Sequence, residues 1–342
     1  MLEVLDLARQ ILADEEAWIV GGAVRDELLG RPVLDVDIAC AEPQRAARAH
    51  ARRSGGAPFP LSERHGAWRV TCQDGRTLDF TPLRGSIDAD LATRDFGLNA
   101  IAVPLAGGEP HDPYGGRDDL EQRAIRAVGD GIFADDPLRL LRAVRLEREL
   151  GFRLDARTEA LLRESAARVG DPAGERILGE LVRLDAAGFR RLCELGLLAP
   201  LGGSLGGPLD AIDDPGFRLV VVLGERLEWL PISNQLRRYA RTLLRAEPPR
   251  DTSRRAVHRF RRETEPWALD ALAFLGFSRL EEAVEAARAR DPTAPLVRGD
   301  ELGLPPGPQI GRALEAIAEE RAAGTLSTKE EALELARRLG RA

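Results

Sequence analysis

The chain has 342 residues, 44% of them hydrophobic, and a formal net charge of −7 at pH 7. That length exceeds one ordinary domain, so we expect at least two folded units with apolar cores. No apolar run approaches the length of a membrane span, and the N-terminus lacks the pattern of a signal peptide. These features argue against a secreted or membrane protein, and we expect a cytoplasmic one.

The three cysteines, Cys40, Cys72 and Cys193, lie far apart and form no Cys-x-x-Cys motif. Neither a disulfide framework nor a cysteine-rich zinc site is therefore indicated. The acidic net charge hides a local excess of cations, because residues 237–262 contain ten arginines against two acids. Such a cluster predicts a positive surface on an acidic protein.

The first 130 residues mix short apolar runs, alternating stretches and glycine turns, which predicts α/β or α+β structure. Residues 18–20 predict a short strand and residues 23–29 a helix, separated by Gly21 and Gly22. Because glycines carry no side chain, backbone N–H groups at the start of this helix can approach a triphosphate. Arg25 is a nearby cation that can pair with the phosphates.

Residues 33–39 predict a strand in which Asp35 and Asp37 alternate with apolar residues. Both carboxylates therefore point to one face of the sheet. A second predicted strand, residues 77–80, places Asp79 in the same pattern, so that it can complete a three-carboxylate site. Closely spaced carboxylates suit Mg²⁺ and two-metal phosphoryl transfer. The alternative is an ordinary strand, turn and helix with aspartates on the surface.

From residue 136 onward, apolar residues recur at helical spacing with few strand signals, so the last two hundred residues are predicted to be helical. Glycine and proline residues interrupt this pattern, most densely over residues 200–215. The helical pattern resumes after that segment, which indicates a loop within a folded protein.

Several motifs together resemble those of one enzyme family. GGAVRDELLG is followed by DVDIA, and residues 94–100 (RDFGLNA) are similar to the family motif RRDFTINA, with Thr93 and Gly97 replacing an arginine and a threonine. Residues 112–130, 135–146 and 174–181 continue the similarity. The chain thus resembles the polymerase β-like nucleotidyltransferase superfamily, and within it the class II tRNA nucleotidyltransferases and bacterial poly(A) polymerases.

This resemblance implies an α+β head with a small mixed sheet, followed by an all-α neck, body and tail. The expected domains are a catalytic head over residues 1–130, a helical neck over residues 131–200, and a tRNA-binding body and tail over residues 201–342. Asp35, Asp37 and Asp79 are the expected catalytic residues, with Asp35 and Asp37 as ligands of Mg²⁺. The expected nucleotide-binding residues are Gly21, Gly22, Arg25, Arg94, Asp95, Asn99, Asp136, Arg139 and Arg142.

The family motif EDxxR reads the incoming base, and here it stands as residues 135–139, with Asp135 in place of the glutamate. Asp136 and Arg139 are three residues apart at the expected start of a helix, hence on one face. A carboxylate acceptor beside a guanidinium donor matches cytosine and adenine and rejects uracil and guanine. The alternative is that Asp136 caps a helix and Arg139 lies in solvent.

The segment between the Asp79 strand and Arg94 is short, whereas enzymes that add a complete CCA end carry a longer flexible loop there. We therefore expect an enzyme that adds two C residues from CTP to tRNA and stops. A CCA-adding enzyme that also uses ATP, an A-adding enzyme, a poly(A) polymerase and a noncatalytic RNA-binding relative remain alternatives. The oligomeric state is left open by the sequence.

The helical region is expected to hold the acceptor and TΨC arms of tRNA by phosphate contacts, because duplex RNA is recognised mainly through its backbone and minor groove. The candidate RNA-binding residues are Arg254, Arg255, Arg261 and Arg262. The alternative is that many of these arginines pair with acids on neighbouring helices.

Overall fold

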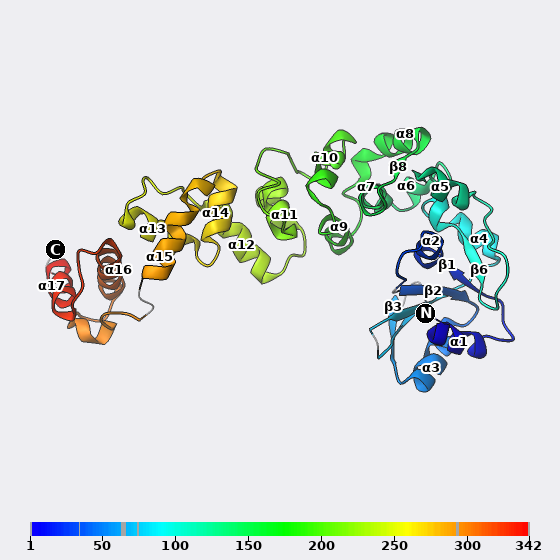
Figure 1. Ribbon diagram of the computed structural model, residues 1–342, viewed down its shortest axis with the longest axis horizontal. Coiled ribbons are helices and arrows are strands. Elements are labelled where there is room, and N and C mark those ends of the chain that lie inside the picture. The colour runs from blue at the N-terminus through cyan, green and yellow to red at the C-terminus, as the bar shows by residue number, and fades with distance from the viewer. Residues whose placement is uncertain (1, 34, 63–65, 74, 292–293, 341–342) are drawn as a thin grey trace. The chain divides into compact units, whose positions relative to one another are not determined.

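The structure is a computed structural model that describes residues 2–33, 35–62, 66–73, 75–291 and 294–340. The chain divides into two compact units. The first comprises Met1–Glu180 and Arg190–Leu201, and the second comprises Leu181–Phe189 and Gly202–Ala342. All described strands lie in the first unit, while the described part of the second is helical (Figure 1).

Six of the described strands of the first unit form one sheet in the order β3-β4-β5-β2-β1-β6. The strands are β1 (Ala17–Val20), β2 (Asp35–Cys40), β3 (Ala57–Ser62), β4 (Ala67–Thr71), β5 (Thr77–Pro82) and β6 (Ala102–Pro104). Strands β2 and β5 are parallel, whereas the other neighbouring pairs are antiparallel. The predicted mixed sheet is thereby confirmed. Leu34, part of the predicted strand 33–39, lies outside the described residues.

Helices flank this sheet and continue the first unit. They are α1 (Leu2–Ile11), α2 (Gly22–Leu28), α3 (Pro43–Ser54), α4 (Ile87–Ala92), η1 (Gly97–Asn99), α5 (Gly116–Gln122), α6 (Ile132–Asp135), α7 (Arg139–Leu150), α8 (Ala156–Glu164), η2 (Ala166–Arg168) and α9 (Gly174–Leu181). Helix α3 packs on β3, β4 and β5, and its small Ala46 and Ala47 are fully buried there. The short parallel strands β7 (Ala124–Ile125) and β8 (Arg153–Leu154) form a second pairing that the sequence pattern did not indicate.

Helix α10 (Ala186–Glu194) contributes residues to both units. The second unit continues with α11 (Pro215–Leu223), η3 (Gly224–Trp229), α12 (Asn234–Arg245), α13 (Arg254–Thr264), α14 (Ala268–Leu275), η4 (Ser278–Leu280), α15 (Glu281–Arg290), η5 (Gly299–Leu302), α16 (Pro308–Ala323) and α17 (Lys329–Leu339). Ser233, Ser253 and Thr328 each accept a backbone N–H at the start of the following helix. Such caps satisfy donors that a helix terminus leaves unpaired. The predicted helical C-terminal part is confirmed.

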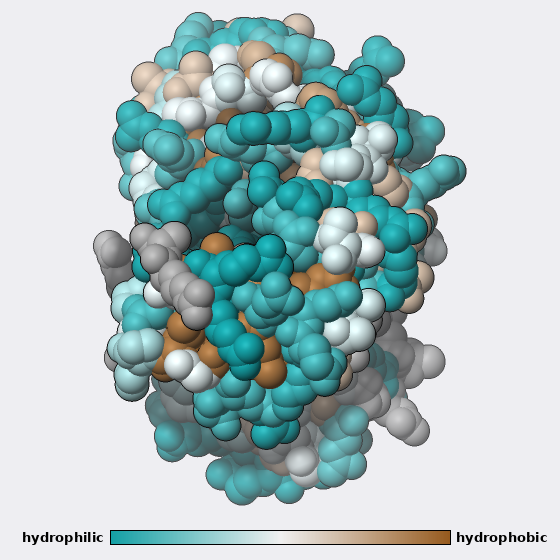
Figure 2. Space-filling model, turned by 90° about the vertical axis from the view of Figure 1, so that its left-hand side faces the viewer, coloured by the Kyte–Doolittle hydropathy of each residue, from teal (hydrophilic) through white to brown (hydrophobic). Residues whose placement is uncertain are grey.

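Two apolar clusters stabilise the second unit. One joins α13, α14 and α15 around Phe260, Leu272 and Val284, and the other joins α16 and α17 around Ile317 and Ala332. Hydrophilic residues cover most of the face that Figure 2 turns to the viewer, with small apolar patches between them. Within the described residues, no helix is long and apolar enough to cross a membrane.

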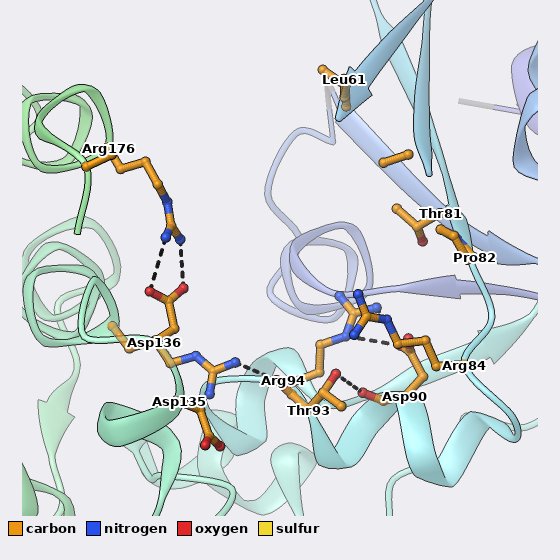
Figure 3. Close-up of a pocket in the computed structure, with 13 residues that line it drawn as sticks. Leu61, Thr81, Pro82, Arg84, Asp90, Thr93, Arg94, Asp135, Asp136 and Arg176 are labelled. Atoms are coloured by element: carbon orange, nitrogen blue, oxygen red, sulfur yellow. Dashed lines mark hydrogen bonds and ion pairs between the residues drawn. The ribbon is translucent and has the colours of Figure 1, made fainter. Parts of the chain in front are cut away.

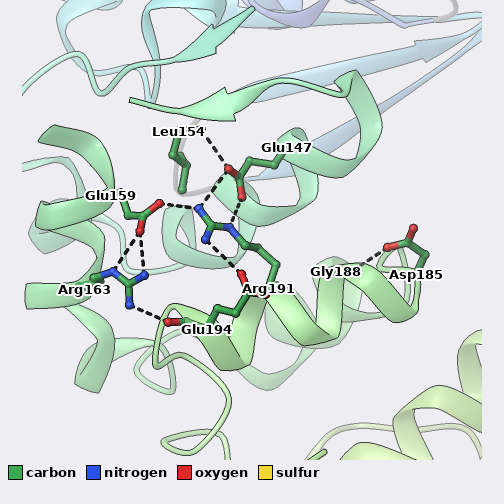
Figure 4. Close-up of polar contacts among 8 residues, drawn as sticks. All are labelled: Glu147, Leu154, Glu159, Arg163, Asp185, Gly188, Arg191 and Glu194. Carbon is green, nitrogen blue, oxygen red and sulfur yellow. Dashed lines mark hydrogen bonds and ion pairs between the residues drawn. The ribbon is translucent and has the colours of Figure 1, made fainter. Parts of the chain in front are cut away.

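Arg191 on α10 lies among three carboxylates of the first unit (Figure 4). Its Nε is 2.9 Å from Glu147 Oε2, and its other nitrogens reach Glu159 and Glu194. Glu147 is buried and also accepts the backbone N–H of Leu154 at 3.0 Å. The ion pairs therefore fasten this end of α10 to α7 and α8.

We predict that Arg191→Met lowers the free energy of unfolding by about 2 to 4 kcal/mol, because it leaves the buried Glu147 carboxylate without its counter-charge. Urea unfolding at pH 7 measures the change. Glu194→Gln is the matched control, since it removes only the exposed end of the network and should cost less than about 1 kcal/mol. Equal losses in both variants would contradict the prediction.

The same network predicts a pH dependence. Hydrogen bonds from Arg163 and Arg191 lower the pKa of Glu159 below its ordinary value of 4.5. The carboxylate therefore stabilises the fold fully above about pH 4.5, and this stabilisation is lost as the pH falls through the lower native pKa. Arg191→Met should weaken this acid dependence when unfolding is measured from pH 3 to pH 6.

Candidate active site

The parallel pairing of β2 and β5 brings the predicted carboxylates together. Asp37 lies directly opposite Asp79, and Asp35 lies opposite Thr77. Because side chains alternate along a strand, the three carboxylates share one face of the sheet. Asp35 is exposed and accepts the hydroxyl of Thr77, whereas Asp79 is only 8% exposed.

Asp79 has a counter-charge within the sheet. Both of its carboxylate oxygens accept hydrogen bonds from Arg69 on β4, each at 2.7 Å. Such a bidentate pair holds the carboxylate in one orientation. The sequence had indicated Asp79 as a third catalytic carboxylate, and that function stays a prediction, but the neutralising Arg69 was not foreseen.

Asp37 is the most perturbed carboxylate of this face. Desolvation by burial, followed by the charge of Asp79, raises its pKa from 3.8 to about 6, against the opposing effect of Arg94. A divalent cation would relieve both causes, because it supplies a counter-charge to a carboxylate that burial has deprived of water. The donor set therefore fits a divalent metal. Among the described residues, no group of three or more histidine, cysteine, aspartate or glutamate side chains is arranged to hold a metal ion.

The glycine turn lies against these groups. Gly21 follows β1 with a φ of 73°, in the left-handed region that disfavours other residues. A Cβ at this position would lie 3.3 Å from Asp37 Oδ2 and 3.4 Å from Arg94 Nη1. Gly22 begins α2. Glycine at position 21 thus leaves the approach to Asp37 and Arg94 open.

Arg25 is bound by protein groups. Its Nε and Nη2 each lie 2.9 Å from an oxygen of Asp26, and its Nη1 donates to Asn99 Oδ1 at 2.8 Å. Asn99 in turn donates to Asp95 Oδ1 at 2.9 Å. Arg25 therefore positions Asn99, and direct contact between Arg25 and a phosphate stays a prediction.

Asp95 joins this chain of contacts to α7. Its Oδ2 lies 2.6 Å from Arg142 Nε, and its Oδ1 accepts the backbone N–H of Phe96. Burial by itself would raise the pKa of Asp95, but Arg142, Asn99 and the Phe96 N–H together hold it below the ordinary 3.8. The carboxylate is thus charged at neutral pH and locks Asn99 and Arg142 in place.

Two cavities of the first unit open beside these groups. The smaller, of about 180 Å³, is lined by Gly21, Gly22, Asp37, Asp95, Asn99 and Arg142 among others. The larger, of about 1070 Å³, extends from Asp136 and Arg139 to the strands β3, β4 and β5. Both cavities are lined by Thr93, Arg94, Asp136, Arg139 and Arg176. A ligand can therefore reach from the glycine turn to the residues predicted to read the base.

Asp136 and Arg139 line the same cavities, but they do not begin one helix together. Helix α6 ends at Asp135, Asp136 is extended, and α7 begins at Arg139. The expectation of a shared helical face was wrong because the residue before a proline, here Pro137, avoids helical backbone angles. Arg139 instead donates to the carbonyl oxygens of Ile132 and Thr93.

The principal partner of Asp136 is Arg176 on α9, which the sequence had not indicated (Figure 3). Arg176 Nη2 and Nη1 lie 2.7 Å and 3.2 Å from the two carboxylate oxygens. Asp136 Oδ1 also accepts the backbone N–H of Leu138, the residue before α7, at 3.2 Å. The alternative of an Arg139 in solvent is contradicted, because that side chain is held by two carbonyls. In the sequence, only the similarity of residues 174–181 to the family pointed to this region. That similarity did not identify Arg176 as the partner of Asp136.

Residues 17–89 and 68–126 match the family model described as the poly(A) polymerase head domain. The CC-adding tRNA nucleotidyltransferase of Thermus thermophilus is 34% identical over 93% of this chain and 92% of its own length. The A-adding enzyme of Deinococcus radiodurans is 35% identical over 92% and 94%. The CC-adding enzyme of Geobacter sulfurreducens is 48% identical, over 49% of this chain and 40% of its own length.

Solved structures share the fold along almost the whole chain. The CCA-adding enzyme of Thermotoga maritima in complex with tRNA superposes with a TM-score of 0.76 and 23% identity over 99% of this chain and 96% of its own. A CCA-adding enzyme bound to CTP gives a TM-score of 0.80 at the same identity, over 98% and 94%. The chain therefore belongs to the family of tRNA nucleotidyltransferases that carry a poly(A) polymerase head domain. It is a nucleotidyltransferase of a polymerase-like family that uses divalent metal ions, as its motifs predict.

We predict that Asp37→Asn stabilises the metal-free protein at pH 7.5 by an amount on the order of 2 kcal/mol, since it removes a charge that burial disfavours. Because the pKa rises from 3.8 to about 6, the native protein binds this proton more tightly than the unfolded chain. The free energy of unfolding therefore falls as the pH increases between these values, and Asp37→Asn removes that decrease.

Thermal unfolding in EDTA from pH 3.5 to pH 7.5 measures this effect. Asp35→Asn is the matched control, because its carboxylate is exposed and its removal should change stability little. A pH profile of Asp37→Asn that follows the wild type would contradict the prediction.

Proposed function

We propose that the chain transfers CMP from CTP to the 3′ end of tRNA with release of pyrophosphate, and that it adds two C residues. The terminal hydroxyl of the RNA attacks the α-phosphate, and one phosphoanhydride bond breaks as the new phosphodiester bond forms. Asp35 and Asp37 would hold Mg²⁺, which activates the hydroxyl and stabilises the leaving pyrophosphate. Asp79 would add negative charge to this face. The bacterial relatives process tRNA, so we place the reaction in the cytoplasm.

The nucleotide would occupy the smaller cavity and the adjoining part of the larger one. Gly21 and Gly22 would admit the triphosphate, with Arg94 and Arg142 as cations. Asp90 orients Arg94, and Asp95, which also holds Asn99, orients Arg142. The base would reach Asp136 and Arg139, where the carboxylate accepts from the exocyclic amine and the guanidinium donates to the ring nitrogen. Head, neck and body would correspond to residues 1–130, 131–200 and 201–342.

The observation that carries the CC specificity is the short connection after β5. Strand β5 ends at Pro82 and α4 begins at Ile87, so only four residues separate them. Helix α4 and Thr93 then lead directly to Arg94. A chain this short leaves no flexible loop to reshape the base site for ATP. Sequence identity does not separate the alternatives, because the CC-adding and A-adding relatives are 34% and 35% identical.

We predict that tRNA lacking its CCA end grows by two nucleotides with CTP alone, by none with ATP alone, and still by two with both. Product length on a sequencing gel measures the outcome. Addition of A to tRNA ending in CC would contradict the CC-only proposal.

Asp35→Asn and Asp37→Asn should abolish incorporation and preserve tRNA binding, and EDTA should stop the wild-type reaction until Mg²⁺ is restored. Retained incorporation would favour a different catalytic site.

The contacts of the arginine-rich segment refine its proposed RNA-binding role. Arg255, Arg261 and Arg262 pair with Glu320, Asp291 and Glu315 at 2.8, 2.7 and 3.2 Å. Their charges are thus offset by acids of α16 and of the segment after α15, as the alternative expected. Arg254 is exposed and has no side-chain ion pair with another described residue.

Three further arginines of residues 237–262, namely Arg238, Arg245 and Arg250, are also exposed and have no ion pair with a described residue. Arg238 and Arg245 lie seven residues apart on α12, hence on one face of the helix. Guanidiniums without a partner bind phosphate without first breaking an ion pair. We therefore propose that Arg238, Arg245, Arg250 and Arg254 carry most of the RNA contacts of this segment.

We predict that replacing these four arginines with alanine reduces the slope of log affinity for tRNA against log salt by about 3. Filter binding between 50 and 300 mM KCl measures the slope. The matched control replaces Arg255, Arg261 and Arg262, whose partners already offset their charge, and should change the slope by less than about 1. A larger effect in the control variant would assign RNA binding to the paired arginines.

A further inference from the structure

The larger cavity has a side that the nucleotide does not need. Its volume of about 1070 Å³ is slightly above the roughly 300 to 1,000 Å³ that encloses one drug-sized ligand. Leu61, Ala67, Thr81, Pro82 and Arg84 line it from β3, β4, β5 and the connection after β5. In Figure 3 the labelled residues of this group lie across the cavity from Asp135, Asp136 and Arg176.

The chemistry of this side suits a nucleotide of an RNA strand. Leu61 is 42% exposed although it is a large apolar residue, and Pro82 adds a second apolar surface. Apolar side chains can pack against a base or a ribose without regard to sequence. Arg84 supplies a cation beside them, and guanidinium is well matched to a phosphate oxygen pair.

Arg84 differs from the other arginines of the cavity in its contacts. Arg94 Nη2 lies 2.6 Å from Asp90, Arg176 pairs with Asp136, and Arg139 donates to main-chain carbonyls. Arg84 is exposed, and its side chain has no hydrogen bond or ion pair with another described residue. It is therefore available to an anionic ligand.

The reaction requires the RNA to approach from one particular side. In an in-line displacement, the attacking hydroxyl and the leaving pyrophosphate lie on opposite sides of the α-phosphate. The glycine turn at Gly21 accommodates the triphosphate, and β5 leads from Asp79 through Pro82 to Arg84. The β3 to β5 side of the cavity is thus left for the strand that carries the attacking hydroxyl.

We propose that this side receives the 3′-terminal nucleotide of the RNA, with Arg84 bound to the phosphate that joins the last two nucleotides and with Leu61 and Pro82 against the terminal nucleoside. The proposal rests on the nucleotidyl transfer proposed above. It assigns the short connection after β5 a second function, which is to position the acceptor end.

The test combines a protein variant with a modified RNA. Arg84→Ala should raise the KM for an acceptor-stem RNA about tenfold and leave the KM for CTP unchanged. A methylphosphonate at the last linkage, which removes that one charge, should raise the wild-type KM by a similar factor. The same RNA should cause no additional increase with Arg84→Ala, because the contact is already lost. Arg84→Lys should recover part of the affinity.

Arg52→Ala is the matched control, since Arg52 is an exposed arginine of α3 without a described partner and does not line the cavity. It should leave both KM values unchanged. If Arg84→Ala and the methylphosphonate each raise the KM for the RNA and their effects multiply when combined, the proposal is overturned. A raised KM for CTP in Arg84→Ala would also overturn it, because it would place Arg84 on the triphosphate. A wild-type enzyme that incorporates no CMP would instead refute the underlying function.

Discussion

Two carboxylates on adjacent strands repel each other unless a cation offsets their charge, and the active face of this sheet is organised around that repulsion. The parallel register places Asp37 opposite Asp79, and the partial burial of Asp37 and the burial of Asp79 weaken the screening of their charges by water. Arg69 offsets Asp79 with two hydrogen bonds, while Asp37 is left with a raised pKa. Because Arg69 neutralises only part of the negative charge of these carboxylates, a divalent cation would be attracted to them.

The arginines near these carboxylates differ in how firmly other protein groups hold them. Hydrogen bonds run from Arg25 through Asn99 to Asp95, and an ion pair joins Asp95 to Arg142. Since these contacts fix both guanidiniums, the proposed binding of a triphosphate would require little reorganisation of them. Arg84, in contrast, has no described partner, and a substrate can provide its first ion pair.

The positions of Asp136 and Arg139, the pair proposed to read the base, depend on residues outside their own motif. Pro137 keeps Asp136 out of α7, and Arg176 then holds the carboxylate at the wall of the cavity. Arg139 is fixed separately by carbonyls from Ile132 and Thr93, and Thr93 directly follows α4. Helix α4 and Thr93 therefore connect the segment after β5 to Arg139.

Local features of the protein follow from the sequence by itself. The glycine turn, the alternation of Asp35 and Asp37, and the change from strands to helices depend on residues close together in the chain, so their patterns predict them. The tertiary structure alone decided that Asp37 lies beside Asp79, that Arg69 and Arg176 hold Asp79 and Asp136, and which arginines stay unpaired. Strand order and ion pairing join residues far apart in sequence, and packing of the whole unit selects among the many acids available to each arginine.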